Sequence, residues 1–418
     1  MTTEIAIMNK SAIALAADSA VTIGNGNKFY NTANKLFTLS KYNPVGVMIY
    51  SNAEFMGYPI ETIIKEYRKI LNDKSFDTLE EYWNDFVKYL EKNFSDNDTL
   101  DDFYGEIISF IRSVDNDISI LTDNEIEKYQ DTIGSTGETI NRDKILEIAE
   151  NAIKDVIDDT YNWYSNLEDE DGFSEKFEII KSSIKDKVYE IVEGIIGVIN
   201  NEYLEKILDL CTMILTKKHN NGSRTGIVIA GFGNKDMLPK LVSARFMGVY
   251  FNVLKCNGKF IKEINDEYAA TILPFAQDDV ISTFMTGIDE GLKEDILDTI
   301  EAYNLHDCSN EECIEKLKQD IDERIKRWSL ERHIYPIMDT VEVAPKEELA
   351  QMAETLVNLT SFRRKLSMDV LSQSVGGPID VALITKGDGF IWVKRKHYFD
   401  MNKNQHFFKN YFNNYKED

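Results

Sequence analysis

Cysteine is scarce in this chain, which has four in 418 residues: Cys211, Cys256, Cys308 and Cys313. Four cysteines in a chain of this length do not make a disulfide framework, so a reducing, cytoplasmic environment is predicted. His306 and Asp307 lie close to Cys308 and Cys313. One such cluster without a second pair of ligands is a weak zinc signal. We therefore expect no metal and no cofactor.

Positive charge is also in short supply, since 47 Lys and Arg face 72 Asp and Glu and give a formal net charge of -25. Nucleic-acid binding needs a clustered basic surface, and an anionic membrane surface attracts basic segments, so neither partner is expected. Long apolar runs are missing too. The most apolar helical region, Ile191–Leu215, is interrupted by charged residues, and the start of the chain lacks the pattern of a signal peptide.

What the chain does have is enough apolar material for a substantial core. Hydrophobic residues make up 43% of the sequence, including 22 Phe and 20 Tyr. Global disorder is therefore not expected. No internal repeat with a fixed period is visible, which argues against a solenoid.

Short, glycine-punctuated segments of β character occur in several separate parts of the chain. The first two, Thr3–Met8 and Ala12–Ala17, are joined by a polar turn, and Ile379–Thr385 and Phe390–Lys396 are joined by the hairpin signal KGDG. The other predicted strands are Leu36–Leu39, Val45–Tyr50, Thr225–Ala230, Phe246–Leu254 and Lys259–Ile264. Hairpin links favour antiparallel pairing over a doubly wound parallel sheet.

Long acidic segments with helical spacing separate these strands. Thr78 and Glu81 form a capping box ahead of an apolar series that begins at Leu79. A second series at helical spacing runs from Phe177 to Ile199, with Lys and Glu on the opposite face. Such stripes usually pack into a core, so we expect a sheet-based domain that carries helical insertions.

The N-terminus offers a candidate nucleophile. Thr2 is small enough for Met1 to be removed after synthesis, which would leave a threonine with a free α-amine. Its hydroxyl could then attack, and the amine, with a reference pKa of about 7.7–8.0, could act as the base near neutral pH. Taken alone, a threonine at this position more often simply starts a strand.

The following residues resemble a known family. Thr2–Met8 (TTEIAIM), Ala12–Thr22 (AIALAADSAVT) and Asn34–Phe37 (NKLF) resemble the start of proteasome β-type subunits and of their bacterial relatives, the HslV peptidase and the Anbu proteins. The resemblance implies that Thr2 is the nucleophile, that Lys35 favours its alkoxide, and that Asp18 holds Lys35 charged and oriented. Without the resemblance, Asp18 would be an ordinary turn carboxylate and Lys35 an ordinary strand lysine.

Later segments extend this resemblance. Gly46–Glu54 (GVMIYSNAE) resembles the family strand whose glycine gives the oxyanion-hole N–H, and Ser51 stands at the place of that glycine. The replacement keeps the backbone donor. Asp369–Thr385 (DVLSQSVGGPIDVALIT) resembles the segment that anchors the free amino terminus, which implies this role for Asp369 and Ser372, with Ser374 an alternative to Ser372. The family's remaining serine has no counterpart near Phe275–Asp279, where Gln277 or Asp278 could substitute.

The fold implied by the resemblance is α+β, a four-layer αββα sandwich with large helical insertions. It divides the chain into a discontinuous core at 1–71, 220–289 and 346–397, helical insertions at 72–219 and 290–345, and a tail at 398–418. The implied function is threonine endopeptidase in a bacterial homo-oligomer acting on peptide or unfolded-protein substrates. A separate ATP-dependent unfoldase has no support in this chain. The alternatives are an amidohydrolase acting on a small amide and a catalytically inactive interaction or assembly protein.

Overall fold

The chain forms two compact units in the computed structural model, which describes residues 3–23, 28–94, 100–136, 141–219, 224–304, 311–366, 376–397 and 399–406. Unit 1 comprises Met1–Phe86, Arg224–Arg245 and Gly258–Asp418, and unit 2 comprises Val87–Ser223 and Phe246–Asn257. The chain is a mixture of helices and antiparallel sheets, as the alternation of strand-like and helical segments predicts.

Two five-stranded sheets contain most of the strands of unit 1, and parts of β10 and β11 in the second sheet belong to unit 2. The first, the β1 sheet, has the order β12-β1-β2-β13-β14 with every pairing antiparallel. Its strands are β1 (Thr3–Asn9), β2 (Ile13–Ala17), β12 (Ala270–Ala276), β13 (Asp380–Thr385) and β14 (Gly389–Lys394). The second, the β6 sheet, has the order β11-β10-β9-β6-β5. Its strands are β5 (Leu36–Thr38), β6 (Val45–Ser51), β9 (Thr225–Gly231), β10 (Lys240–Tyr250) and β11 (Val253–Glu263). Two short ribbons pair β3 (Val21–Ile23) with β4 (Lys28–Tyr30) and β7 (Glu54–Phe55) with β8 (Tyr58–Pro59).

Side chains of β1 alternate between two cores. Ala6 and Met8 join a cluster that also contains residues of the β6 sheet, such as Met48 and Val228. The intervening Ile5 and Ile7 belong to a different cluster, which contains residues of α11. Since side chains alternate across a strand, every second residue of β1 points toward the β6 sheet. This alternation decides which way the polar residues at the start of β1 must face.

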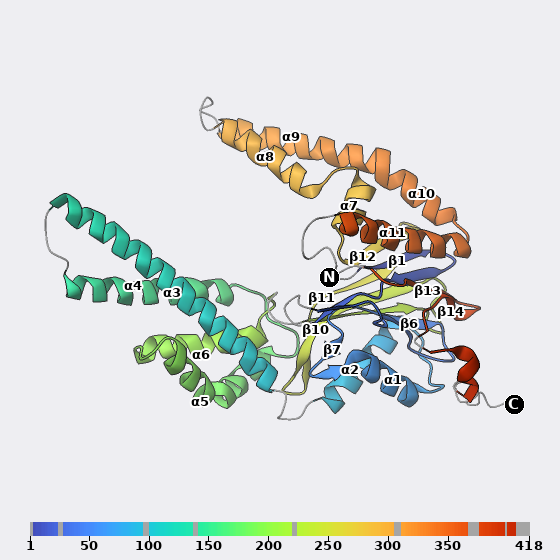
Figure 1. The fold of residues 1–418 in the computed structure, drawn as a ribbon, viewed down its shortest axis with the longest axis horizontal. Coiled ribbons are helices and arrows are strands. Elements are labelled where there is room, and N and C mark those ends of the chain that lie inside the picture. The colour runs from blue at the N-terminus through green and yellow to red at the C-terminus, as the bar shows by residue number, and fades with distance from the viewer. Residues whose placement is uncertain are drawn as a thin grey trace. The chain divides into compact units, whose positions relative to one another are not determined.

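Helices cover the outer faces of these sheets. The second cluster packs α10 (Tyr335–Val343) and α11 (Lys346–Leu366) against the β1 sheet. Figure 1 shows α1 (Ile60–Leu71) and α2 (Leu79–Asn93) on the opposite side, next to the β6 sheet. The capping box is confirmed: the Glu81 N–H donates to Thr78 Oγ1 (3.3 Å), and the Thr78 N–H donates to Glu81 Oε2 (3.2 Å).

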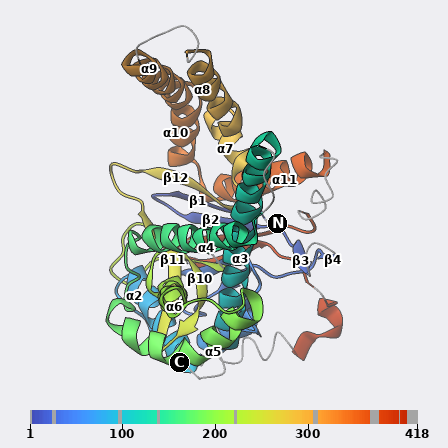
Figure 2. The ribbon, with the colours of Figure 1, turned by 90° about the vertical axis from the view of Figure 1, so that its left-hand side faces the viewer.

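A pair of long helices lies between α7 (Asp279–Thr286) and α10 in the chain. α8 (Glu290–Asn304) and α9 (Glu311–Ser329) lie side by side in both views (Figures 1 and 2), and a short π-helical segment links α9 to α10. Lys293 Nζ on α8 contacts Asp322 Oδ1 on α9 at 2.9 Å. This pair falls within 290–345, which the sequence predicts as helical.

One predicted strand was wrong, and one strand of the two five-stranded sheets was not anticipated, nor were the four short strands of the two ribbons. The sequence pattern predicts a single strand over Phe246–Leu254, but β10 ends at Tyr250 and β11 begins at Val253. Phe251 and Asn252 form the turn between them with positive φ of 52° and 61°. The strand β12 was missed because it contains Pro274, a residue that usually argues against a strand inside a sheet.

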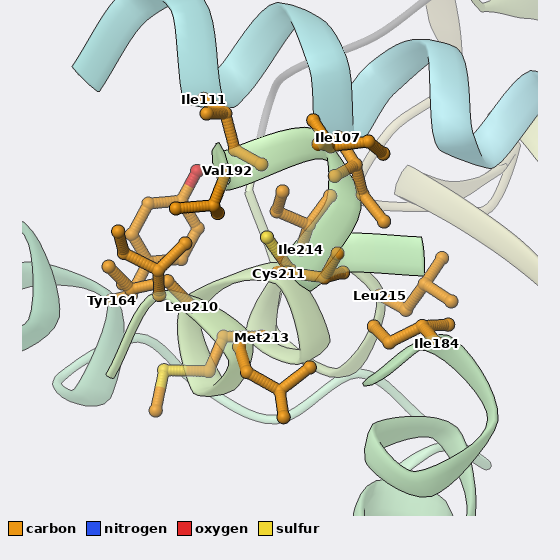
Figure 3. Close-up of a cluster of buried hydrophobic side chains, with 14 of the residues drawn as sticks. Ile107, Ile111, Tyr164, Ile184, Val192, Leu210, Cys211, Met213, Ile214 and Leu215 are labelled. Atoms are coloured by element: carbon orange, nitrogen blue, oxygen red, sulfur yellow. The ribbon is translucent and has the colours of Figure 1, made fainter. Parts of the chain in front are cut away.

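Unit 2 is mainly helical. Its helices are α3 (Leu100–Thr136), α4 (Arg142–Ser165), α5 (Phe177–Ile195) and α6 (Asn201–Thr216), together with the end of α2. Figure 3 shows side chains of α3 to α6 meeting in one apolar cluster, which includes Ile107, Tyr164, Ile184 and Leu210. The predicted apolar series of α5 is confirmed as core, since Ile180, Ile184, Val188 and Ile191 are all buried. Within the described ranges, no helix is both long enough and apolar enough to span a membrane.

Candidate active site

A buried lysine between two carboxylates lies at the start of β1. Lys35 Nζ is 2.5 Å from Asp18 Oδ1 and 3.0 Å from Glu4 Oε1. The side chains of both carboxylates are fully buried, and that of Lys35 is 5% exposed. An ammonium held this way in a dry site exerts a stronger field on its neighbours than it would in water. Asp18 and Lys35, predicted from sequence as partners, are thus brought together.

Asp18 receives three hydrogen bonds from three distant parts of the chain. Besides Lys35, the Thr3 N–H donates to Asp18 Oδ1 at 3.3 Å, and the Gly376 N–H donates to Asp18 Oδ2 at 2.9 Å. In return the Asp18 N–H donates to the Thr3 carbonyl (3.1 Å). These contacts place the Asp18 carboxylate at the peptide nitrogen that joins Thr3 to the residue before it, and the Lys35 ammonium is held by the same carboxylate oxygen.

The segment from Gly376 to Pro378 closes this site from the C-terminal side. Ser19 donates through its N–H to the Gly376 carbonyl (3.2 Å) and through Oγ to the Pro378 carbonyl (2.5 Å). Gly377 has φ of +84°, and a Cβ at this position would meet Asn31 at 2.9 Å and Ser19 at 3.3 Å. Only glycine meets both requirements without strain.

Ser51 ends β6 with a positive φ of 67°. This is the left-handed region, which glycine enters freely and which other residues adopt only at a cost. The backbone of Ser51 thus adopts a conformation that glycine would adopt without strain, although the residue is serine. Two positions earlier, the Ile49 N–H donates to the Lys35 carbonyl (2.9 Å), which connects β6 to the lysine of the site.

The end of β12 lies next to the start of β1, since Ala276 pairs with Thr3 in the sheet. Gln277 follows and is buried, whereas Asp278 is exposed. Thr3 Oγ1 is buried and has no hydrogen-bond partner among the described residues. The polar end of β12 therefore belongs to the immediate surroundings of the site.

Other predicted site residues lie outside the described residues. These are the nucleophile Thr2 and the anchoring residues Asp369, Ser372 and Ser374. The roles assigned to them by resemblance remain predictions.

Glu4 and Gly376 are members of this site that the sequence analysis did not single out. A signal for Glu4 was available: it is the one charged residue in β1, all of whose residues are buried. A charged side chain in a fully buried strand normally has a partner. Gly376 acts through its backbone N–H, for which a sequence gives little signal.

No group of three or more His, Cys, Asp or Glu side chains within the described ranges is placed to hold a metal ion. Of the four residues considered for zinc, His306, Asp307 and Cys308 are not among the described residues, and Cys313 lies in α9.

Comparisons with known proteins return structures and no sequence relatives. No family model matches the chain, and no curated protein matches it. Among solved structures, the Anbu (Gly-1) mutant from Hyphomicrobium sp. strain MC1 matches with 9% identity and a TM-score of 0.29, over 100% of this chain and 99% of that one. Anbu from Yersinia bercovieri, an ancestral beta-subunit, matches with 9% identity and a TM-score of 0.28, over 99% and 96%. The helical assembly of the Anbu complex from Pseudomonas aeruginosa matches with 8% identity and a TM-score of 0.29, over 98% and 93%.

This chain is similar to Anbu structures. Anbu is one of the groups whose N-terminal motif the chain resembles.

Proposed function

We propose that this chain is a proteasome-like threonine peptidase that hydrolyses peptide bonds through Thr2 once Met1 has been removed. The observation that carries the proposal is the buried Lys35–Asp18 ion pair beside the Thr3 N–H. The carbonyl carbon of Thr2 is bonded to the Thr3 nitrogen, so we propose that the Thr2 hydroxyl lies close to the buried Lys35 ammonium.

The chemistry follows from this placement. Thr2 Oγ attacks the carbonyl carbon of the scissile peptide, and its proton passes to the α-amine of the same residue. The Lys35 ammonium stabilises the negative charge on the attacking oxygen, and Asp18 fixes the position of Lys35. As the C–N bond breaks, the departing amine takes the proton. Water activated by the α-amine then adds to the ester and releases the acid.

Ser51 would supply a backbone donor to the carbonyl oxygen of the substrate. Its φ of 67° keeps the glycine-like backbone direction, which supports this role despite the added side chain.

The arrangement of layers supports the same family. We propose a four-layer αββα sandwich in which α10 and α11, the β1 sheet, the β6 sheet, and α1 with α2 follow one another. The core would comprise 1–71, 220–289 and 346–397, with the insertions at 72–219 and 290–345. Because one matched structure is a helical Anbu assembly, we also propose that this chain forms a homo-oligomer.

A substrate panel compares the wild-type chain with Thr2→Ala, using fluorogenic peptides and small amides. We expect peptide cleavage in the wild type and a loss of about 10³-fold or more in Thr2→Ala. The matched control Thr299→Ala changes an exposed threonine of α8 and should retain full activity. Turnover of small amides alone would instead indicate an amidohydrolase. No turnover combined with a retained Met1 would indicate an interaction or assembly protein.

A further inference from the structure

Glu4 lies at the centre of the candidate site with its side chain directed between the two sheets. It is the second residue of β1 and pairs with Ala17 of β2 and Phe275 of β12, so its backbone is held from both sides. Ala6 and Met8, two and four residues later, point toward the β6 sheet. Because side chains alternate along a strand, Glu4 points to the same side. Lys35, the residue immediately before β5, contacts it there.

The charges of this cluster do not balance within the three groups. Glu4 and Asp18 each carry one negative charge, and Lys35 carries one positive charge, which leaves a formal charge of -1. All three side chains are buried, so solvent screens this charge poorly. A nearby negative charge favours the protonated form of an amine. The field of Glu4 therefore acts on any amine that lies at the start of β1.

Other charged groups around the site are already paired or lie at its edge. On β13, Asp380 forms an ion pair with Lys396. On α11, Arg364 is bonded to Asp279 at the start of α7, and the exposed Lys365 approaches Gly376. From the β6 sheet, the titratable Tyr50 contacts the Ser243 hydroxyl (3.4 Å). Among the described residues, Glu4 is thus the carboxylate that contacts Lys35 in addition to the predicted partner Asp18.

We propose that Glu4 is a positioning residue that holds Lys35 in place and, through its buried negative charge, sets the pH at which the nucleophile becomes reactive. This inference rests on the proposed function, because it concerns the α-amine of a processed Thr2. A protonated α-amine cannot accept the proton of the attacking hydroxyl. Because Glu4 favours the protonated form of the amine, it raises the pH at which the nucleophile becomes reactive. Its ion pair with Lys35 also keeps the Lys35 side chain oriented toward the site.

The test is the rate of modification of the full chain by a threonine-directed β-lactone, followed by intact mass between pH 5 and pH 10. In Glu4→Gln, we expect the rising limb of the pH profile to move to lower pH by about one unit. At a pH well below the rising limb of the wild type, we compare labelling rates as fractions of each protein's own plateau rate. This fraction should be up to about tenfold higher for Glu4→Gln than for the wild type. The control Glu66→Gln removes an exposed carboxylate of α1 and should leave the limb in place.

Each outcome decides a separate point. A lower plateau with an unmoved limb would overturn the role of Glu4 and leave the proposed function standing. Absence of label on the wild-type chain at every pH would overturn the proposed function and this inference with it. If Glu4→Gln does not fold, Glu4→Asp is used in its place, because the shorter side chain increases the distance between the carboxylate and Lys35 Nζ. The limb should then shift in the same direction by a smaller amount, and an unmoved limb would count against the proposal.

Discussion

The Gly376 N–H donates a 2.9 Å hydrogen bond to Asp18 Oδ2 across 358 residues of sequence. The same carboxylate receives the Thr3 N–H and the Lys35 ammonium through its other oxygen. Four segments of the chain therefore meet at one buried side chain. A site of this kind forms only when both sheets and the closing segment are in place, so its reactivity reports on the folded state of unit 1.

Removing the charge of Lys35 should affect both reactivity and stability. In Lys35→Met, Glu4 and Asp18 remain buried without their shared ammonium, and we expect a loss of about 3–5 kcal/mol in the free energy of unfolding. Labelling of Thr2 by a β-lactone should fall by about 10²-fold or more. Urea unfolding and intact mass measure these effects. The exposed Lys69→Met should change stability by less than about 0.5 kcal/mol, and labelling of Lys35→Met at the wild-type rate would contradict the electrostatic role.

Gly377 should not tolerate a side chain. In Gly377→Ala, the new Cβ would press on Asn31 and Ser19 at a φ that suits glycine. We expect a loss of about 1–3 kcal/mol in stability, together with slower labelling, because the neighbouring Gly376 N–H would move from Asp18. Gly387→Ala is the control, since nothing lies within 4 Å of a Cβ at that position. Equal stability of the two variants in thermal unfolding would contradict this account.

Ser51 offers a stabilising substitution. Because its φ is 67°, Ser51→Gly should relieve local strain and raise the free energy of unfolding by about 0.5–1 kcal/mol. Ser51→Ala keeps a Cβ and serves as the control, with no gain expected. If Ser51 acts only through its backbone N–H, both variants should label at close to the wild-type rate. A large loss of labelling in Ser51→Ala alone would show that the hydroxyl itself is required.

Unit 2 should lose a local contribution to stability at acid pH. The Glu205 carboxylate on α6 accepts hydrogen bonds from Tyr189 Oη (2.5 Å) and Lys185 Nζ (2.9 Å) on α5. These bonds, that from Tyr189 first, lower the pKa of Glu205 to about 2 from an ordinary value of 4.5. A carboxyl whose folded pKa is depressed stabilises the fold when ionised, so this contribution is present above about pH 4.5 and is lost as the pH falls toward 2.

The variant Glu205→Gln should therefore be less stable than wild type at pH 6, and this difference should shrink toward pH 2. The side chain is 43% exposed, so solvent screening limits the effect to about 1 kcal/mol. Urea unfolding followed by circular dichroism at several pH values measures it. Glu190→Gln, which removes a more exposed partner of Lys187, is the control. A difference of the same size at pH 6 and pH 3 would contradict the assignment.

Much of the fold could be predicted from local pattern. The first two strands, the hairpin of β13 and β14, and the capping box before α2 all follow from alternation, glycine turns and capping chemistry. The errors arise where tertiary pairing overrides local preference. Pro274 is accepted within β12, and the turn after β10 puts Phe251, a bulky residue that rarely adopts positive φ, in that conformation.

The candidate site divides in the same way. The proximity of Asp18 and Lys35 follows from the family motif, because the motif preserves their order and, after allowing for about one inserted residue before Lys35, their spacing. The contacts of Glu4 and Gly376 depend on which face of β1 is turned inward and on how a distant segment returns. A lone charge in a buried strand signals that Glu4 has a partner, but the identity of that partner, and the contact of Gly376, are properties of the three-dimensional pairing.

The most direct test of the central claim is the intact mass of the purified full-length chain before and after treatment with a threonine-directed β-lactone. The account predicts loss of Met1 and a single adduct, which disappears in Thr2→Ala and remains in Thr299→Ala. A retained Met1, or a processed Thr2 that takes no adduct, would contradict it and would indicate that the buried Lys35–Asp18 pair serves a non-catalytic fold.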